Sequence, residues 1–104
     1  KLGGQKAIAA LADAVSNDSD QAVRLSAVKA VARRGGSEAI DALTQALQAD
    51  AEPSVRYEAL VSLAQWGDDQ VSDAILQALD DQEAFIRDKA AELLHGRSIA
   101  GRAP

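Results

Sequence analysis

Cysteine and methionine are both absent from this 104-residue sequence, and histidine occurs once, at position 95. Without cysteine the chain has neither disulfides nor thiolate metal ligands, and it suits either redox compartment. His95 alone cannot complete a nitrogen-rich metal site, and it has no cysteine or second histidine with which to build a nucleophilic catalytic set. We therefore expect no metal, no cofactor and no enzymatic activity.

Aromatic residues are nearly as scarce, since only Tyr57, Trp66 and Phe85 occur. Apolar residues nevertheless make up 47% of the chain, which excludes a disordered polypeptide. Most of them are Ala, Leu, Val and Ile. Ala and Leu favour helices, and small Ala side chains let helices approach closely. The composition therefore predicts an all-α protein of one domain.

Basic residues are outnumbered, with 11 Lys and Arg against 16 Asp and Glu and a net charge of −5. Nucleic-acid grooves and anionic membrane surfaces both attract an excess of Lys and Arg. No apolar run approaches the roughly 20 residues that a membrane span needs. We expect neither nucleic acid nor membrane as a partner, and instead a protein partner with a basic surface.

What the sequence does contain is a repeat. The segment "VRLSAVKAVARRGGS" at 23–37 returns as "VRYEALVSLAQWGDD" at 55–69, a shift of 32 residues. A third copy follows at a shift of 31, with one residue missing between Leu79 and Asp81. A fixed period of this length is typical of repeat proteins built from stacked units.

Each unit is predicted to contain two helices, here called B and A. The B helices are expected at 5–16, 38–48 and 70–80, and the A helices at 21–34, 53–66 and 83–95. Asp20 and Glu52 are the predicted N-caps of A helices, and Ser37 and Asp69 those of B helices. Gly35 and Gly67 follow the first two A helices, where a left-handed cap residue is favoured.

A two-helix unit buries its apolar face only by stacking on neighbours. The prediction is therefore a solenoid of about six antiparallel helices in the order B-A-B-A-B-A over residues 1–95, followed by a loose tail at 96–104. Because neither end has a polar capping repeat and the chain begins at Lys1, we expect a fragment of a longer array. The alternative is that the ends are covered by another molecule, including end-to-end self-association.

Three Asp–Arg pairs recur at the turn into each A helix: Asp18 with Arg24, Asp50 with Arg56, and Asp81 with Arg87. With the period near 32, this pattern resembles HEAT repeats and is most similar to the short PBS-lyase HEAT-like class. The resemblance implies a right-handed superhelix whose B helices line the concave side. It also implies that Asp and Arg of successive units hydrogen-bond as a structural ladder.

HEAT proteins that resemble deoxyhypusine hydroxylase carry His-Glu metal ligands at positions matching Leu25-Ser26, Tyr57-Glu58 and Asp88-Lys89, and no histidine is present there. We therefore expect a non-catalytic scaffold for protein–protein interaction. Proteins with similar repeats also act as subunits or chaperones of phycobilin lyases, which is one alternative. A structural spacer within a larger protein is the other.

Three surfaces are candidate binding sites. The concave side should present two polar rows, Asp41 with Asp73 and Gln45 with Gln77. The turns into the A helices should form an acidic rim, comprising Asp18, Asp20, Asp50, Glu52, Asp80, Asp81 and Glu83. Trp66 has no aromatic counterpart in the other units, and it either covers the end of the core or anchors a partner.

Overall fold

A computed structural model describes residues 2–102, with side chains described for residues 6–97. Six helices make up this part of the chain: α1 (Leu2–Asn17), α2 (Gln21–Arg34), α3 (Ser37–Ala49), α4 (Pro53–Leu63), α5 (Asp69–Ala78) and α6 (Ala84–Arg102). No strand occurs in it. The predicted all-α class and the alternating helix order are confirmed.

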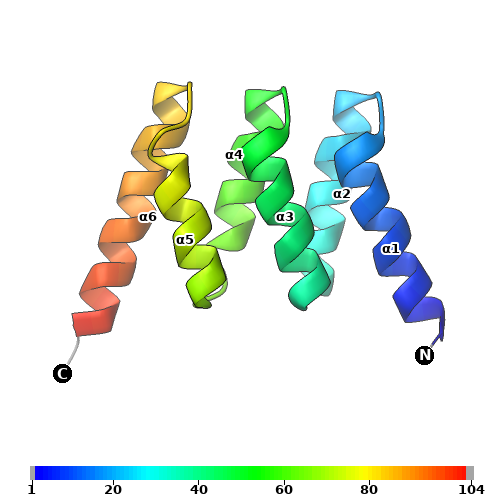
Figure 1. Cartoon of the computed structure of the whole chain (residues 1–104), viewed down its shortest axis with the longest axis horizontal. Coiled ribbons are helices and arrows are strands. Elements are labelled where there is room, and N and C mark those ends of the chain that lie inside the picture. Colours follow the sequence, from blue (N-terminus) through cyan, green and yellow to red (C-terminus); the bar gives the residue numbers. More distant parts are fainter. Residues whose placement is uncertain (1, 103–104) are drawn as a thin grey trace.

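The helices form two layers, with α1, α3 and α5 in front of α2, α4 and α6 in Figure 1. We call these the B layer and the A layer, and the pairs α1–α2, α3–α4 and α5–α6 units 1, 2 and 3. Within each layer, a helix also packs against its counterpart in the next unit. The chain is therefore an all-α repeat solenoid.

The core lies between the two layers and repeats from unit to unit. Ala27, Ala59 and Ala90 occupy the same position in the three A helices and are all buried, which brings the facing helices close together. Val55 and Ile86 share another position and are fully buried. The repeating small and branched residues therefore explain why each unit docks on the next in the same way.

Two predicted N-caps are displaced by one residue. Gly36 precedes α3 in place of Ser37, and Asp68 precedes α5 in place of Asp69. The carbonyl oxygens of Gly36 and Asp68 accept the first helical hydrogen bonds, so Ser37 and Asp69 already lie inside their helices. Asp20 and Glu52 cap α2 and α4 as predicted, although only Asp20 forms a side-chain cap hydrogen bond, accepting from Ala22 N at 2.9 Å.

Two helix C-termini also differ from the prediction. Helix α4 ends at Leu63 because Gln65 and Trp66 donate backbone hydrogen bonds to carbonyls three residues earlier. Gly67 does not take the predicted left-handed conformation, whereas Gly35 has a φ of 72°. Helix α5 ends at Ala78, two residues short of the prediction.

The sixth helix does not end near residue 95 as predicted. It continues through most of the segment expected to be a tail, as far as Arg102, while residues 103–104 lie outside the described part. Arg97 donates to the Ser72 hydroxyl through Nε at 3.1 Å and Nη2 at 3.0 Å. This contact ties the continued helix to α5. The division into a repeat domain and a tail stays a prediction.

Candidate functional site

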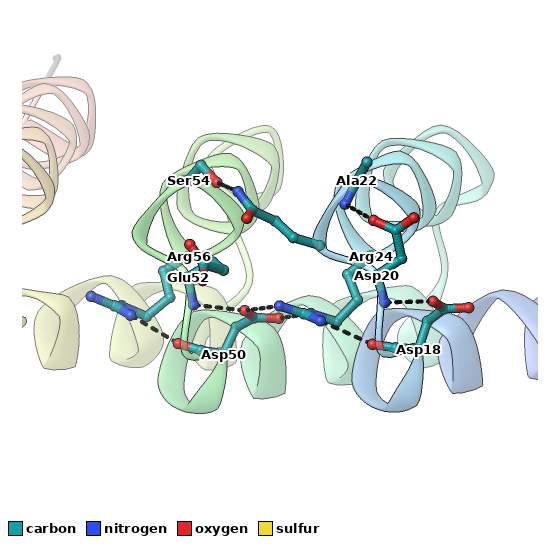
Figure 2. Close-up of polar contacts among 9 residues, drawn as sticks. Asp18, Asp20, Ala22, Arg24, Asp50, Glu52, Ser54 and Arg56 are labelled. Atoms are coloured by element: carbon teal, nitrogen blue, oxygen red, sulfur yellow. Dashed lines mark hydrogen bonds and ion pairs between the residues drawn. The ribbon is translucent and has the colours of Figure 1, made fainter.

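The recurring Asp and Arg residues meet between neighbouring units, as Figure 2 shows for the first two. Arg24 donates to the Asp50 carboxylate through Nε at 2.9 Å and Nη2 at 3.2 Å. Its Nη1 donates to the backbone carbonyl of Asp18 at 2.9 Å. One guanidinium therefore links its own turn to the turn of the next unit through a bidentate contact.

The second contact repeats this geometry. Arg56 donates to the Asp81 carboxylate at 2.9 and 3.0 Å, and to the carbonyl of Asp50 at 2.8 Å. Each carboxylate also accepts a backbone N–H from its own turn, Glu52 N for Asp50 and Glu83 N for Asp81, both at 2.9 Å. Together these six residues form the ladder: Asp18, Arg24, Asp50, Arg56, Asp81 and Arg87.

Burial and charge act in opposite directions on the ladder. Burial alone would raise the pKa of the Asp81 carboxyl, but hydrogen bonds from Arg56 and from Glu83 N outweigh it and lower that pKa. The hydrogen bond to Asp81 likewise outweighs burial and raises the pKa of the Arg56 guanidinium. The hydrogen bond to Asp50 raises the pKa of Arg24 in the same way. Asp81, Arg56 and Arg24 therefore stay ionised across the physiological range.

The polar rows lie on the surface of the B layer, where Asp41, Gln45, Asp73 and Gln77 are all exposed. No described hydrogen bond joins the two members of either row. Instead, Gln70 Nε2 donates to Asp41 Oδ1 at 2.8 Å, and Gln48 Nε2 donates to Gln77 Oε1 at 2.7 Å. The repeat pattern did not point to Gln48 and Gln70 as contacts of the polar rows. Each contact joins residues that are 29 apart, three fewer than the repeat period, so its two partners are not at equivalent positions.

A pocket of about 710 Å³ opens between the C-terminal ends of α3 and α5, and we call it the rim groove. Its polar lining is Gln48, Asp50, Gln77, Asp80, Asp81 and Gln82, with the Arg56 guanidinium at the Asp81 side. Carbonyl groups at the end of a helix carry partial negative charge. Asp50 and Asp81 are already paired with Arg24 and Arg56, so the features that favour a positively charged group in the rim groove are the two helix ends and the exposed Asp80 carboxylate.

Charge is distributed unequally between the two layers. The acidic residues described in the B helices are Asp13, Glu38, Asp41, Asp69 and Asp73. The only basic residue described in these helices is Lys6. The described residues of the A helices include Arg24, Lys29, Arg33, Arg34, Arg56, Arg87, Lys89 and Arg97 against Glu58, Asp88 and Glu92. The acidic rim residues lie in, or directly beside, the turns that join α1 to α2, α3 to α4 and α5 to α6. The B layer and the rim thus form one acidic side, and the A layer a basic one.

Trp66 lies in the link between α4 and α5, at the opposite end of the helices from the acidic rim. Its partly buried ring packs against the core, and a Cβ atom at Gly35 would lie 3.8 Å from its Cζ2 atom. The ring therefore covers the turn between units 1 and 2. This position favours a covering role for Trp66, and its role as a partner anchor stays a prediction.

Two kinds of feature are absent from the described residues. No group of three or more His, Cys, Asp or Glu residues is arranged to hold a metal ion. Nor does this part of the chain include a helix with the length and apolar character of a membrane span.

Comparison with models of protein families identifies a known family. A family model described as HEAT repeats matches residues 1–64 and, in a second placement, residues 40–99. The two placements overlap and together cover nearly the whole chain. No curated protein matches the sequence.

Proposed function

Because the chain belongs to the HEAT repeat family, we propose that it is a non-catalytic scaffold that binds a protein partner with a basic surface. Solenoids of stacked repeats commonly bind partners along an extended face. The observation that carries the proposal is the unequal distribution of charge between the layers. The period of 32 and 31 residues also supports a place in the short PBS-lyase HEAT-like class.

The proposed docking surface combines the B layer with the rim groove. Asp41 and Asp73 supply exposed carboxylates on neighbouring helices, and Gln45 and Gln77 supply amide groups beside them. A basic segment lying across α3 and α5 would place a Lys or Arg side chain in the rim groove. Complementary charge of this kind accelerates encounter and selects basic partners over acidic ones.

The test compares charge reversals on the two layers. Asp73→Lys changes the B layer, and Asp80→Lys changes the lining of the rim groove. Glu92→Lys makes the same change of charge on the exposed surface of α6, in the A layer. Each protein is used as bait in a native lysate, and retained proteins are identified by mass spectrometry.

We expect the wild type and Glu92→Lys to retain a basic protein. Asp73→Lys and the double variant Asp41→Lys/Asp73→Lys should lose it. Its affinity should fall as the salt concentration rises, because surface charges are screened. Equal loss with Glu92→Lys would contradict docking on the B layer.

The two alternatives give different results in the same experiment. A retained phycobiliprotein, or bound material with the visible absorbance of a tetrapyrrole, would favour a subunit of a phycobilin lyase. Retention of nothing by any of the baits would favour a structural spacer. Both results would overturn the scaffold proposal.

A further inference from the structure

Helix α5 ends in a tighter turn than α3, because unit 3 has one residue fewer than unit 2. At the end of α3, the N–H of Asp50 bonds to the carbonyl of Ala46, four residues back. At the equivalent place in unit 3, the N–H of Asp81 bonds to the carbonyl of Ala78, only three residues back. Such a 3₁₀ turn rises about 2.0 Å per residue against about 1.5 Å in an α-helix, so three residues span the distance of four. Asp81 therefore still meets Arg56, although the last turn of α5 is wound more tightly.

The rim groove opens beside this turn, and its volume of about 710 Å³ lies in the range of pockets that hold small ligands. Besides its polar lining it has an apolar one, which comprises Leu47, Ala49, Ala51, Ala74 and Ala78. Long basic side chains bury their aliphatic stems along such surfaces while the charged head stays among polar groups. The rim groove therefore suits a guest that has both an apolar stem and a polar head.

Two side chains of the rim groove have acceptor oxygens that no described group uses. No described donor reaches the carboxylate of Asp80, which is exposed. Gln48 donates to Gln77 through Nε2 at 2.7 Å, and its own amide oxygen accepts no described hydrogen bond. A bound donor would therefore find a carboxylate on the side of α5 and an amide oxygen on the side of α3.

Two backbone carbonyls at the end of α3 also lack an N–H donor. In a continued α-helix, the N–H groups of residues 52 and 53 would bond to the carbonyls of Gln48 and Ala49. Glu52 N donates to the Asp50 carboxylate instead, and Pro53 has no N–H. Gln48 and Ala49 both line the rim groove. The end of α3 therefore supplies further acceptors beside the two side chains.

A guanidinium group matches such a set of acceptors, because its five N–H donors lie in one plane. Arg24 and Arg56 show the match within the chain, since each binds a carboxylate through Nε and Nη2 and a backbone carbonyl through Nη1. We propose that the rim groove receives one arginine side chain of the partner, with the guanidinium on the Asp80 side and the stem along the alanines. Arg56, which also lines the groove, is already neutralised by Asp81.

This inference rests on the proposed function, because the arginine belongs to the basic segment that lies across α3 and α5. It adds a preference between two side chains of equal charge. A lysine in the same place offers a compact, strongly hydrated ammonium group without the planar fork of donors. The rim groove should therefore distinguish Arg from Lys, whereas the exposed carboxylates of Asp41 and Asp73 should attract both alike.

Two synthetic peptides of equal charge test this preference. The lysine peptide alternates Lys and Gly over nine residues, and the arginine peptide differs only in having Arg in place of the central Lys. Isothermal titration calorimetry at low salt gives the dissociation constant of each peptide for the wild type, Asp80→Asn and Asp73→Asn. Asp73→Asn is the matched control, because it also removes one exposed carboxylate but lies outside the rim groove. Circular dichroism checks that both variants are folded.

We expect the wild type to bind the arginine peptide about fivefold more tightly than the lysine peptide, the effect of about one net hydrogen bond. Asp80→Asn should lose this preference, whereas Asp73→Asn should bind both peptides more weakly and keep it. Equal binding of the two peptides by the wild type, or a preference that survives in Asp80→Asn, would overturn the arginine site and leave the basic docking surface standing. Binding of neither peptide would overturn both.

Discussion

At the scale of single residues, Arg56 shows how one side chain can join three segments of the chain. Its guanidinium binds a carboxylate of the following unit and a carbonyl of its own unit, and its stem is buried between them. Arg87 has the same place in the sequence pattern but only the carbonyl contact. The two arginines therefore form a natural pair for comparison.

We predict that Arg56→Ala lowers the free energy of unfolding by about 3 kcal/mol, because it leaves the buried Asp81 carboxylate without its counter-ion. Arg87→Ala should change it by less than about 1 kcal/mol, because an exposed arginine contributes little. Urea denaturation measures both values. Equal effects of the two substitutions would show that the contact between units is not what stabilises the fold.

The lowered pKa of Asp81 predicts a dependence of stability on pH. The folded pKa lies below the unfolded value of about 3.9, so the unfolded state binds more protons between the two values. The contribution of Asp81 is therefore complete above the unfolded pKa and is lost as the pH falls through the folded pKa. We expect the stability difference between wild type and Asp81→Asn to be constant above about pH 5 and to shrink below about pH 4.

Urea denaturation at a series of pH values gives this difference directly. Asp41→Asn, on the exposed B layer, controls for the general effect of removing one carboxylate. A difference between wild type and Asp81→Asn that stays constant down to pH 2 would contradict the assignment.

At the scale of helices and turns, the period in the sequence predicted the number, order and type of the helices, but not all of their ends. The reason lies in the links between A and B helices. Only two residues join α2 to α3, and this tight turn uses the positive φ angles of Gly35 and Gly36. Five residues join α4 to α5, so Gly67 adopts no such conformation although it aligns with Gly35.

These two glycines should respond differently to the same substitution. Gly35→Ala should destabilise the protein by about 2 kcal/mol, because φ 72° and ψ −172° lie in a region that is essentially restricted to glycine. Gly67→Ala should leave stability unchanged or raise it by up to about 1 kcal/mol, because no atom lies within 4 Å of the added Cβ. Thermal unfolding of the two variants measures both effects, and similar losses would contradict the assigned turn conformations.

The candidate site was predictable to a similar extent. The Asp–Arg spacing pointed to the residues that join neighbouring units, Arg24 with Asp50 and Arg56 with Asp81, whereas a contact between units for Asp18 and Arg87 stays a prediction. The residues of the polar rows are exposed, and their role in binding stays a prediction. The contacts of Asp41 with Gln70 and of Gln77 with Gln48 were not foreseen. The repeat pattern identifies equivalent positions, whereas the relative tilt and shift of neighbouring helices decide which side chains meet.

At the scale of the whole molecule, unit 2 is the only described unit with a neighbour on both sides. Stability in such a linear array is a sum of contributions from units and from the interfaces between them. The end units, each with one interface, should therefore open more often than the middle unit.

Hydrogen exchange at low protein concentration should show the slowest amides in α3 and α4, and faster exchange in α1 and α6. Amides of α1 that exchange as slowly as those of α3 in the dilute sample would contradict this order.

The one-way arrangement of the ladder has a consequence for how such a chain can change in length. The Asp50 carboxylate of unit 2 receives Arg24 from unit 1, and Arg56 of unit 2 reaches the Asp81 carboxylate of unit 3. A duplicate of residues 37–68 inserted after residue 68 would bring one more ladder carboxylate, from Asp50, and one more ladder guanidinium, from Arg56, so each internal interface would again contain one Asp–Arg contact. Duplication or loss of a whole unit thus leaves the Asp–Arg pairing of the ladder intact at every internal interface, whereas a cut within a unit does not.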